Sequence, residues 1–430
     1  MESKAEKVEV KSGLKLAGLP MSIFIPVAVI VIGAVYLNKL PAGMIGAFAV
    51  MMVLGAILGL IGNKTPIVKD YLGGGPIIAI FGTAALVYFQ ILPEKTIEII
   101  DVFMTSGGFL NFYIAALITG SILGMDSKLL VKAGARYAAP LLAGVLGSFV
   151  LAGAVAGVIG YGWKDGILNI AMPIMGGGMG AGAVPMSQIY SELLGRDVTQ
   201  VLSILVPALA LGNMFSIIAA GLLDKLGKAR PNLTGNGQLM KGFDYKAEKA
   251  EAPNIKLMGV GMLMSVAFFI LGVLLNMVIT PIHSYALMII AVAICKIVGV
   301  VPDEVQKGAN QWYQYIAQNL TLALLVGIGV SYTSLGDIIN AISVQYVVLV
   351  AVVVVGAILG SGFVGKLVGF NFIESSLTAG LCMANMGGTG DVAVLSAANR
   401  MELMPFAQIS SRLGGALILI IASIIVPLFV

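Results

Sequence analysis

The chain has 430 residues, of which 59% are hydrophobic and only 11% charged, and its mean hydropathy is +1.01. Soluble globular domains carry about 25% charged residues, so this composition excludes an ordinary soluble enzyme or binding module. The net charge of +4 reflects where Lys and Arg fall in loops and gives no basis for nucleic-acid binding.

Apolar stretches of about 17 to 25 residues recur along the chain, and each can cross a hydrocarbon core of about 30 Å. This pattern predicts an all-α polytopic membrane protein. The first apolar run has no A-x-A cleavage signal, so we expect it to remain as a helix. We predict eleven membrane spans, at residues 19–37, 41–62, 74–92, 108–125, 138–160, 199–226, 255–278, 284–301, 316–331, 343–365 and 404–428.

Two segments of another kind lie between these spans, near residues 167–190 and 371–400, and both are rich in Gly, Ser, Ala and Asn. Non-helical backbone is tolerated at membrane depth only where it is buried in protein or lines a cavity. Interrupted segments in corresponding halves of a chain point to a transporter site near the middle of the membrane.

The distribution of Lys and Arg predicts the orientation. With the amino terminus in the cytoplasm and the carboxyl terminus outside, twenty of the 25 basic residues fall in inner loops. This asymmetry requires both interrupted segments to be re-entrant hairpins that return to the side they came from. Because five spans separate them, the hairpins enter from opposite sides, which predicts an inverted repeat of two five-helix units.

These features divide the chain into four parts. Residues 1–40 form a cytoplasmic amino terminus and the first helix, and residues 41–226 form the first repeat with its hairpin. Residues 227–255 are expected to be a cytoplasmic linker without a fold of its own. Residues 256–430 form the second repeat with the other hairpin.

The first hairpin contains the glycine-rich run PIMGGGMGAGAVP at residues 173–185. Glycine permits positive φ angles and leaves backbone groups uncovered. Exposed N–H groups at the start of a half-helix attract carboxylates, and exposed carbonyls attract cations. The alternative is tight helix packing. A nucleotide loop is excluded, since no Lys-Ser/Thr pair follows.

The second hairpin has the tip NMGGTGD at residues 385–391. The oxygens of Asn385, Thr389 and Asp391, with free backbone carbonyls, are hard ligands that suit Na⁺. Asp391 lies in an apolar setting, which predicts a functional role. The alternative is an ion pair with Arg412 or Arg400. Glu374 at the start of the hairpin is expected to stabilise a helix terminus.

Arg412 lies inside the last apolar run, where a cation costs about 2.5–3.5 kcal/mol. An anionic substrate would offset that cost. The alternative is a structural partner such as Asp391 or a cage of carbonyls. Asn213 is expected to make a helix–helix hydrogen bond. His283, the only histidine, falls in an outer loop. Glu192 flanks the first hairpin on the outer side and is expected to be solvated. Cys295 and Cys382 lie in apolar segments, which argues against a disulfide.

The segments GGGMGAGAVP, ESSLTAGLCMANMGGTGD, VLSAANRM and AQISSRLGG resemble the signature segments of the bacterial 2-hydroxycarboxylate transporter family. The resemblance extends over nearly the whole chain. It implies a secondary transporter of citrate, malate or lactate, driven by Na⁺ or H⁺, and not an enzyme. It also implies a homodimer in the bacterial cell (inner) membrane, no cofactor besides the coupling ion, and an elevator movement of one domain.

The resemblance also implies roles for individual residues. The substrate would contact Arg412, Ser411, Gly180, Gly388 and Thr389. The cation would bind Gly177, Cys382, Met383, Asn385, Thr389 and Asp391, the first three through their backbone carbonyls.

Two departures from the family pattern bear on the substrate. Citrate-specific relatives carry Asn in place of Met179 and a second Arg in place of Met386. An arginine can pair a further carboxylate in a charge-assisted fork, and Met cannot. A symporter of malate is therefore favoured over one of citrate or lactate. The alternatives are an exchanger of malate or citrate for lactate, and a membrane subunit of a Na⁺-pumping decarboxylase. The sequence does not decide between Na⁺ and H⁺.

Overall fold

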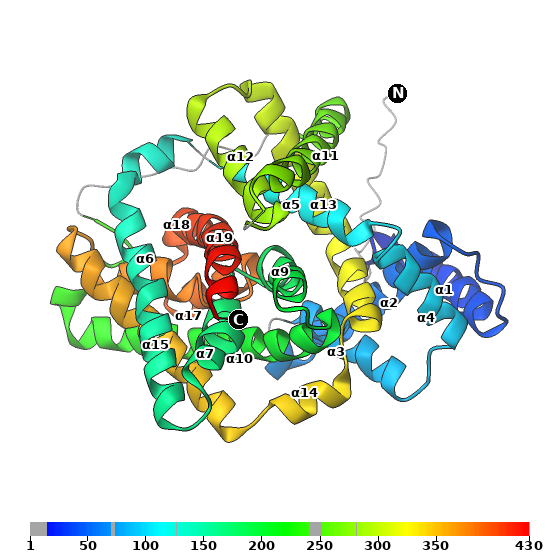
Figure 1. Cartoon of the computed structure of the whole chain (residues 1–430), viewed down its shortest axis with the longest axis horizontal. Helices are drawn as coiled ribbons and strands as arrows, with labels where there is room; N and C mark the ends of the chain where they lie inside the picture. The colour runs from blue at the N-terminus through cyan, green and yellow to red at the C-terminus, as the bar shows by residue number, and fades with distance from the viewer. Residues whose placement is uncertain (1–14, 70–73, 126, 241–251, 281, 430) are drawn as a thin grey trace, which may run out of the picture.

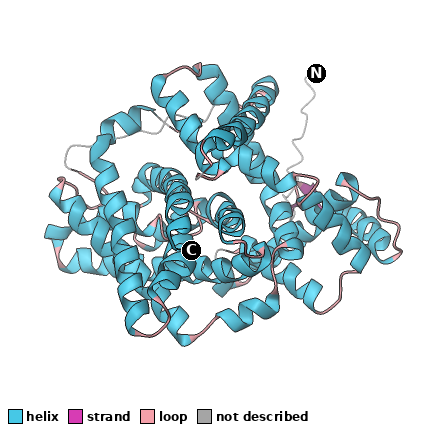
Figure 2. Cartoon of the chain, in the orientation of Figure 1, coloured by secondary structure: helices cyan, strands magenta, loops and turns pink. Residues whose placement is uncertain are grey.

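Nearly all of the described chain is helical, as the apolar composition predicts (Figure 2). The computed structural model describes residues 15–69, 74–125, 127–240, 252–280 and 282–429. Within these ranges the only strands are β1 (Lys15–Leu16) and β2 (Leu19–Pro20), which pair antiparallel before the first helix. Helices satisfy their own backbone hydrogen bonds, which a segment in lipid has to do.

Seven helical segments in the described part of the chain are long and apolar enough to cross a membrane, and a bent pair adds an eighth. They are α2 (Met44–Lys64), α6 (Ser127–Val158), α10 (Val198–Ala229), α11 (Ile255–Val278), α13 (Asp303–Ser331), α15 (Val344–Leu367) and the segment Met401–Phe429. The pair is α4 (Glu94–Met104) and α5 (Phe109–Leu123), bent by 43°. The prediction of an all-α polytopic membrane protein is therefore confirmed.

Three shorter apolar helices coincide with further predicted spans. They are α1 (Met21–Tyr36), α3 (Gly75–Tyr88) and α12 (Ser284–Val298), each under 18 residues long. Because their length alone does not carry them across a bilayer, the count of eleven spans stays a prediction. The short α14 (Leu335–Ala341) connects α13 to α15.

Two helical stretches were not expected from the sequence. The amphipathic α4 precedes a predicted span, and α13 begins at Asp303, well before the predicted residue 316. Both stretches are polar enough to look like loops. In α13 several of the polar side chains have partners or line a cavity. The Gln311 Oε1 atom, for example, accepts a hydrogen bond from the Asn254 backbone N–H at 2.8 Å.

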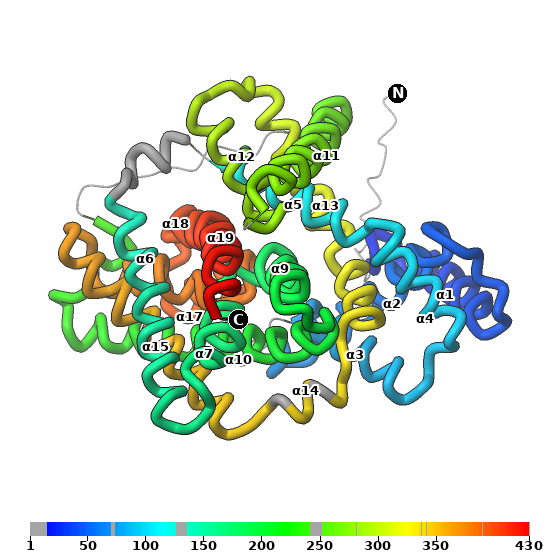
Figure 3. Tube along the Cα trace, viewed as in Figure 1, coloured from blue at the N-terminus to red at the C-terminus, as the bar shows by residue number. Residues whose placement is uncertain are grey.

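The helices pack in two groups (Figure 1). We call α2, α3, α5, α11, α12 and α13 the α13 bundle, because all of them pack around α13 or its neighbours. We call α6, α10, α15, the two hairpins and the C-terminal helix the α15 bundle. In Figure 3 the trace shows α6 and α15 side by side. Their backbones approach closely, since a Cβ added to Gly147 would lie 2.5 Å from the Gly356 carbonyl oxygen.

Both interrupted segments are hairpins, each built from two helical arms. The first comprises α7 (Trp163–Asp165), η2 (Gly166–Ala171), α8 (Met172–Ile174), η3 (Met179–Ala183) and α9 (Val184–Leu194). The second comprises α16 (Phe372–Ser375), η5 (Ser376–Leu381) and α17 (Gly388–Ala397). In the first, the Tyr190 hydroxyl donates to the Leu168 carbonyl at 2.8 Å, so the arms lie side by side. In the second, Arg400 Nε lies 3.5 Å from Glu374 Oε1, so the two ends meet.

Helix α10 lies beside the ends of the two hairpins at its own opposite ends. It has 32 residues and is about 48 Å long. The first hairpin ends where α10 begins. The second hairpin is followed by Arg400, whose Nη1 atom lies 3.3 Å from Oδ1 of Asp224, near the other end of α10. Between these ends, the Asn213 side-chain oxygen accepts a hydrogen bond from the Met386 backbone N–H at 3.2 Å. The inverted-repeat prediction requires this arrangement, although the repeat itself stays a prediction.

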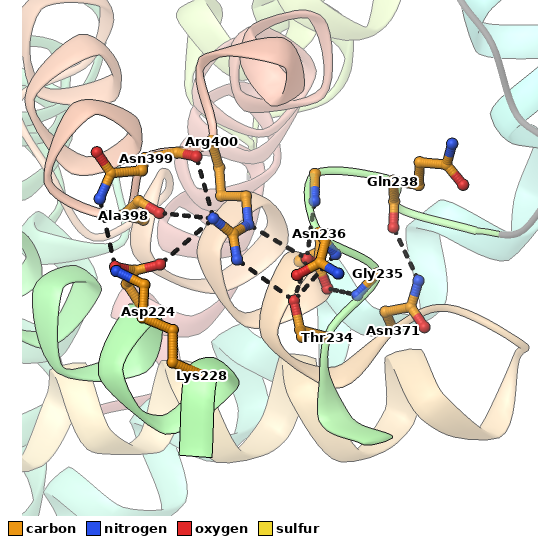
Figure 4. A network of polar contacts seen from close by, with 12 residues as sticks. Asp224, Lys228, Thr234, Gly235, Asn236, Gln238, Asn371, Ala398, Asn399 and Arg400 are labelled. Carbon is orange, nitrogen blue, oxygen red and sulfur yellow. Dashed lines mark hydrogen bonds and ion pairs between the residues drawn. The ribbon is translucent and has the colours of Figure 1, made fainter. Parts of the chain in front are cut away.

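A polar network fixes the start of the predicted linker to the base of the second hairpin (Figure 4). The Glu374 carboxylate is fully buried. It accepts hydrogen bonds from the Thr234 hydroxyl at 2.7 Å and from the backbone N–H groups of Gly235 at 2.8 Å and Gly237 at 3.2 Å. Glu374 therefore anchors residues after η4 (Pro231–Leu233), within the predicted linker. Residues 241–251 lie outside the described ranges.

Candidate functional site

A cavity of about 670 Å³ lies where the two bundles meet at the hairpin tips. Clefts of this size hold small organic ligands. One wall of the cavity comes from the α15 bundle and consists of the two hairpin tips, Gln408 and Arg412. The other wall comes from the α13 bundle and consists of faces of α5 and α13. The lining of the cavity includes Asn63, Lys69, Tyr113, Leu117, Gly177, Gly178, Met179, Gly180, Asn213, Tyr313, Gln318, Thr321, Met386, Gly387, Gly388, Asp391, Gln408, Ser411 and Arg412.

The two hairpin tips contact each other through glycine. Gly177, Gly178 and Gly387 have φ angles of 75°, 118° and 76°, which side chains rarely adopt. A Cβ added to Gly178 would lie 2.9 Å from the Met386 carbonyl oxygen. The glycine run predicted to break the first hairpin therefore does so, and tight contact between the tips is the second reason for glycine there.

At each hairpin tip, a helix begins beside the cavity. The second arm of the first hairpin begins with η3, and α17 begins at Gly388, immediately after the tip of the second hairpin. The amino-terminal end of a helix carries a partial positive charge and free N–H groups, and it binds anions. Two such ends beside one cavity favour a negatively charged ligand.

Arg412 lies in a π-helical turn, η7 (Ser410–Gly414), between α18 (Met404–Ile409) and α19 (Gly415–Ile425). Such turns recur at functional sites, because the extra residue redirects a side chain. The Tyr137 hydroxyl fixes the turn through a 2.7 Å hydrogen bond with the Ser410 hydroxyl. The Arg412 side chain is half-buried and lines the cavity.

No carboxylate of the described residues lies within 4 Å of the Arg412 guanidinium. Arg412 and Asp391 therefore do not form the direct ion pair that was the alternative. The contact that Arg412 does make is with an aromatic ring of the other bundle. Its Cζ atom lies over the Tyr313 ring, 5.2 Å from the centroid. This is the geometry of a cation–π interaction. The edge of the guanidinium therefore remains available for a ligand.

Asp391 is fully buried in a cluster of oxygens. The Ser411 hydroxyl lies 2.8 Å from both carboxylate oxygens and 2.9 Å from the Cys382 carbonyl oxygen. A hydroxyl has one hydrogen to donate, so these three acceptor oxygens compete for it. The Asn385 amide adds one donor to Asp391 Oδ1 at 3.0 Å. Such an excess of hard oxygen acceptors over donors suits a small cation.

The other predicted cation ligands surround this cluster. A Cβ added to Gly177 would lie 2.2 Å from the Ser411 carbonyl oxygen, and one added to Gly414 would lie 2.5 Å from the Met383 sulfur. The Asn385 side-chain oxygen accepts a hydrogen bond from the Gly387 N–H at 2.7 Å, so it holds the tip of the second hairpin. The structure therefore brings these residues together.

The predicted substrate contacts also lie at the cavity. Met179 and Met386 line it, and Gly388 has open space where a side chain would be. Gly180 faces the α13 bundle, since a Cβ there would lie 3.4 Å from Tyr113. The side chain of Thr389 lies outside the described part of the structure. Arg400, the other predicted partner for Asp391, pairs instead with Asp224 and Glu374 (Figure 4), so that alternative is wrong.

The α13 bundle contributes cavity residues that the sequence did not reveal. Tyr313, Ala317 and Thr321 repeat every four residues along α13 and line one wall with Gln318. The Thr321 hydroxyl forms a 2.6 Å hydrogen bond with the Tyr113 hydroxyl of α5. A polar stripe with helical spacing is the signal that identifies such a wall. Asn213, expected between helices, instead supports the tip of the second hairpin.

The cavity also reaches the connection between α2 and α3, where Asn63 and Lys69 line it. On the far side of the hairpin tips, the bundles are joined by Glu192 and His283. Glu192 Oε2 lies 3.1 Å from His283 Nε2, and the Glu192 side chain is 67% exposed, which agrees with the prediction of a solvated glutamate. The hydrogen bond from His283 holds the pKa of the Glu192 carboxyl below its usual value.

Replacing Gly177 with alanine should severely impair the site. The new Cβ would lie 2.2 Å from the Ser411 carbonyl oxygen, and the residue's φ of 75° strains any side chain. We expect binding of an organic anion at the cavity to weaken at least about tenfold, with a lower melting temperature in detergent. Gly388→Ala is the matched control for folding, because nothing lies within 4 Å of its Cβ position. Equal melting temperatures for the two variants would contradict the tight contact at Gly177.

The chain is similar to known proteins over nearly its whole length. The sequence model of the 2-hydroxycarboxylate transporter family matches residues 16–424. The chain is 42% identical to the Na(+)-malate symporter of Bacillus subtilis (strain 168), over 96% of this chain and 92% of the relative. It is 40% identical to the citrate/sodium symporter of Salmonella typhimurium, over 97% and 95%. It is 38% identical to the citrate transporter CitP of Lactococcus lactis subsp. lactis, over 96% and 94%.

Proposed function

Because the chain belongs to the 2-hydroxycarboxylate transporter family, we propose that it is a secondary transporter that moves a 2-hydroxycarboxylate together with Na⁺. One observation carries the proposal. Arg412 faces the cavity beside two helix starts, with no carboxylate of the described chain within 4 Å. A site with this electrostatic character binds an organic anion. The family assignment argues against a decarboxylase subunit.

Malate is the substrate that the lining of the cavity favours. One arginine can pair one carboxylate in a bidentate fork. The 2-hydroxyl and the second carboxylate are then left to the backbone N–H groups near Gly180 and Gly388. Met179 and Met386 offer no charge for a third carboxylate. The proposed order of preference is malate, then lactate and citrate.

Na⁺ is proposed to bind at the oxygen cluster around Asp391. Ser411 links the two sites, since its hydroxyl contacts Asp391 and its neighbour in the chain is Arg412. A cation there would order Ser411 and the tip of the second hairpin before the acid binds. Coupling follows if the cation and the acid each favour the same state of the tip.

Movement is proposed to follow the division between the bundles. Arg412, the two tips and Asp391 all belong to the α15 bundle, so this bundle can carry acid and cation past the α13 bundle as an elevator. We further propose eleven spans, an inverted repeat and a homodimer in the bacterial cell membrane, with a cytoplasmic amino terminus. In that orientation Lys69 marks the cytoplasmic mouth of the cavity, and the Glu192–His283 contact closes the outer side.

Uptake into proteoliposomes tests the proposed function. Malate, lactate and citrate would each be offered with an inward Na⁺ gradient, an inward proton gradient or neither. We expect Na⁺-driven accumulation, with malate preferred. Accumulation driven only by protons would overturn the choice of Na⁺. Counterflow without accumulation under any cation gradient would instead show an exchanger.

A further inference from the structure

The guanidinium of Arg412 is held by a residue of the opposite bundle. Tyr313 belongs to α13, whereas Arg412 belongs to the C-terminal helix that carries the proposed acid site. The distance of 5.2 Å from Cζ to the ring centroid is within the range of a favourable cation–π contact. This contact joins the proposed acid site to the opposite bundle, so it needs its own explanation.

The Tyr313 ring is carried by a rigid part of the α13 bundle. At this point α5 crosses α13 at Gly120, where an added Cβ would lie 2.3 Å from both the Tyr313 Cβ and the Ala309 carbonyl oxygen. The side chain of Tyr313 is therefore anchored at its base by close helix packing. A ring fixed in this way offers the guanidinium one defined position.

A ring and a carboxylate bind different parts of a guanidinium. The aromatic face attracts the cation through its π electrons, while the five N–H groups lie in the guanidinium plane and form a fork that matches a carboxylate. The ring can therefore hold Arg412 without occupying the atoms that an acid needs. It also offsets part of the cost of a cation in a half-buried apolar setting.

We infer that Tyr313 is a positioning residue for the acid, acting only in the conformation seen here, by holding the Arg412 guanidinium in place for a carboxylate. This inference rests on the proposed function. If the α15 bundle slides past the α13 bundle, Arg412 leaves Tyr313 behind. The Tyr313 ring then improves binding of the acid from the proposed cytoplasmic face of the membrane, where Lys69 lines the cavity. It contributes nothing to binding of the acid from the outer face.

Transport measured separately from each face tests this inference. The KM for malate would be determined with saturating Na⁺ in right-side-out and inverted membrane vesicles that contain the full chain. The variants are Tyr313→Leu, which removes the ring, and Tyr313→Phe, which keeps it. Tyr315→Leu is the matched control, because Tyr315 lies on the same helix and stacks on Trp312 outside the cavity.

In inverted vesicles, where malate enters from the proposed cytoplasmic face, Tyr313→Leu should raise KM about fivefold. Tyr313→Phe and Tyr315→Leu should stay within about twofold of the wild type, and so should every variant in right-side-out vesicles. KM does not depend on the amount of folded protein, so a partly unstable variant remains informative.

An unchanged KM for Tyr313→Leu in inverted vesicles would overturn the inference, and so would an equal rise on both faces. A Tyr313→Phe variant as impaired as Tyr313→Leu would also overturn it, because the hydroxyl rather than the ring would then matter. Arg412→Ala, measured alongside, separates the two levels of the argument. Saturable malate uptake by that variant would overturn the proposed function itself, whereas loss of uptake there with a normal Tyr313→Leu would overturn only the role of Tyr313.

Discussion

Replacing Arg412 with alanine should reduce Na⁺-driven malate uptake at least about a hundredfold. Hydrogen bonds to charged groups contribute about 1.5–3 kcal/mol each, and a bidentate arginine–carboxylate pair makes two of them. The variant also leaves a carboxylate in the cavity without a counter-charge. The initial rate of uptake into proteoliposomes measures the effect, and Arg412→Lys should retain part of the activity because it keeps the charge but loses the fork.

The matched control for this prediction is Arg136→Ala, which removes an exposed arginine of α6 in the same bundle. Its uptake should equal that of the wild type. Wild-type uptake by Arg412→Ala, with the protein correctly inserted, would remove Arg412 from the acid site.

Replacing Asp391 with asparagine should flatten the dependence of malate uptake on Na⁺. The two side chains have nearly the same shape, so the fully buried site can keep its packing. The substitution removes the one negative charge of the cluster and turns an acceptor oxygen into an N–H₂ donor. A cation bound by the cluster around Ser411 and Cys382 would then lack its counter-charge. Uptake as a function of Na⁺ concentration, at constant ionic strength, measures the change.

The control here is Asp303→Asn, an exposed position in the first turn of α13. It should leave the Na⁺ dependence intact. An Asp391→Asn variant that responds to Na⁺ as the wild type does would exclude this carboxylate from the coupling site.

The sequence was sufficient to predict where the two interrupted segments break, because the physics there is local. A run such as Gly176 to Gly178 can be read directly as backbone that breaks a helix, and Gly177 and Gly178 do adopt positive φ. Hydropathy likewise located the long apolar helices, with α11 observed at Ile255–Val278 as predicted. Charge placement predicts hairpins that return to their own side of the membrane, which stays a prediction, and Arg400 contacts Glu374 at the base of the second one.

What the sequence did not reveal depends on contacts between distant segments. The π-helical turn around Arg412 is held by Tyr137 of another helix, and no local sequence pattern predicts this turn. Glu374 does lie in the first turn of α16, as expected, but its partners in the linker and at Arg400 were not predicted. Tyr313 lay in a polar stretch that hydropathy assigns to a loop. In each case the partner is chosen by tertiary packing, which composition and periodicity do not encode.

The central claim is that a cation at the Asp391 cluster and an acid at Arg412 bind the same state of the second hairpin tip. The most direct test is the dissociation constant of malate for the purified wild-type protein, measured by calorimetry in Na⁺ and in K⁺ at equal ionic strength. The account predicts that Na⁺ strengthens malate binding at least about tenfold, and that malate strengthens Na⁺ binding by the same factor. Equal affinity for malate in the two salts would contradict it.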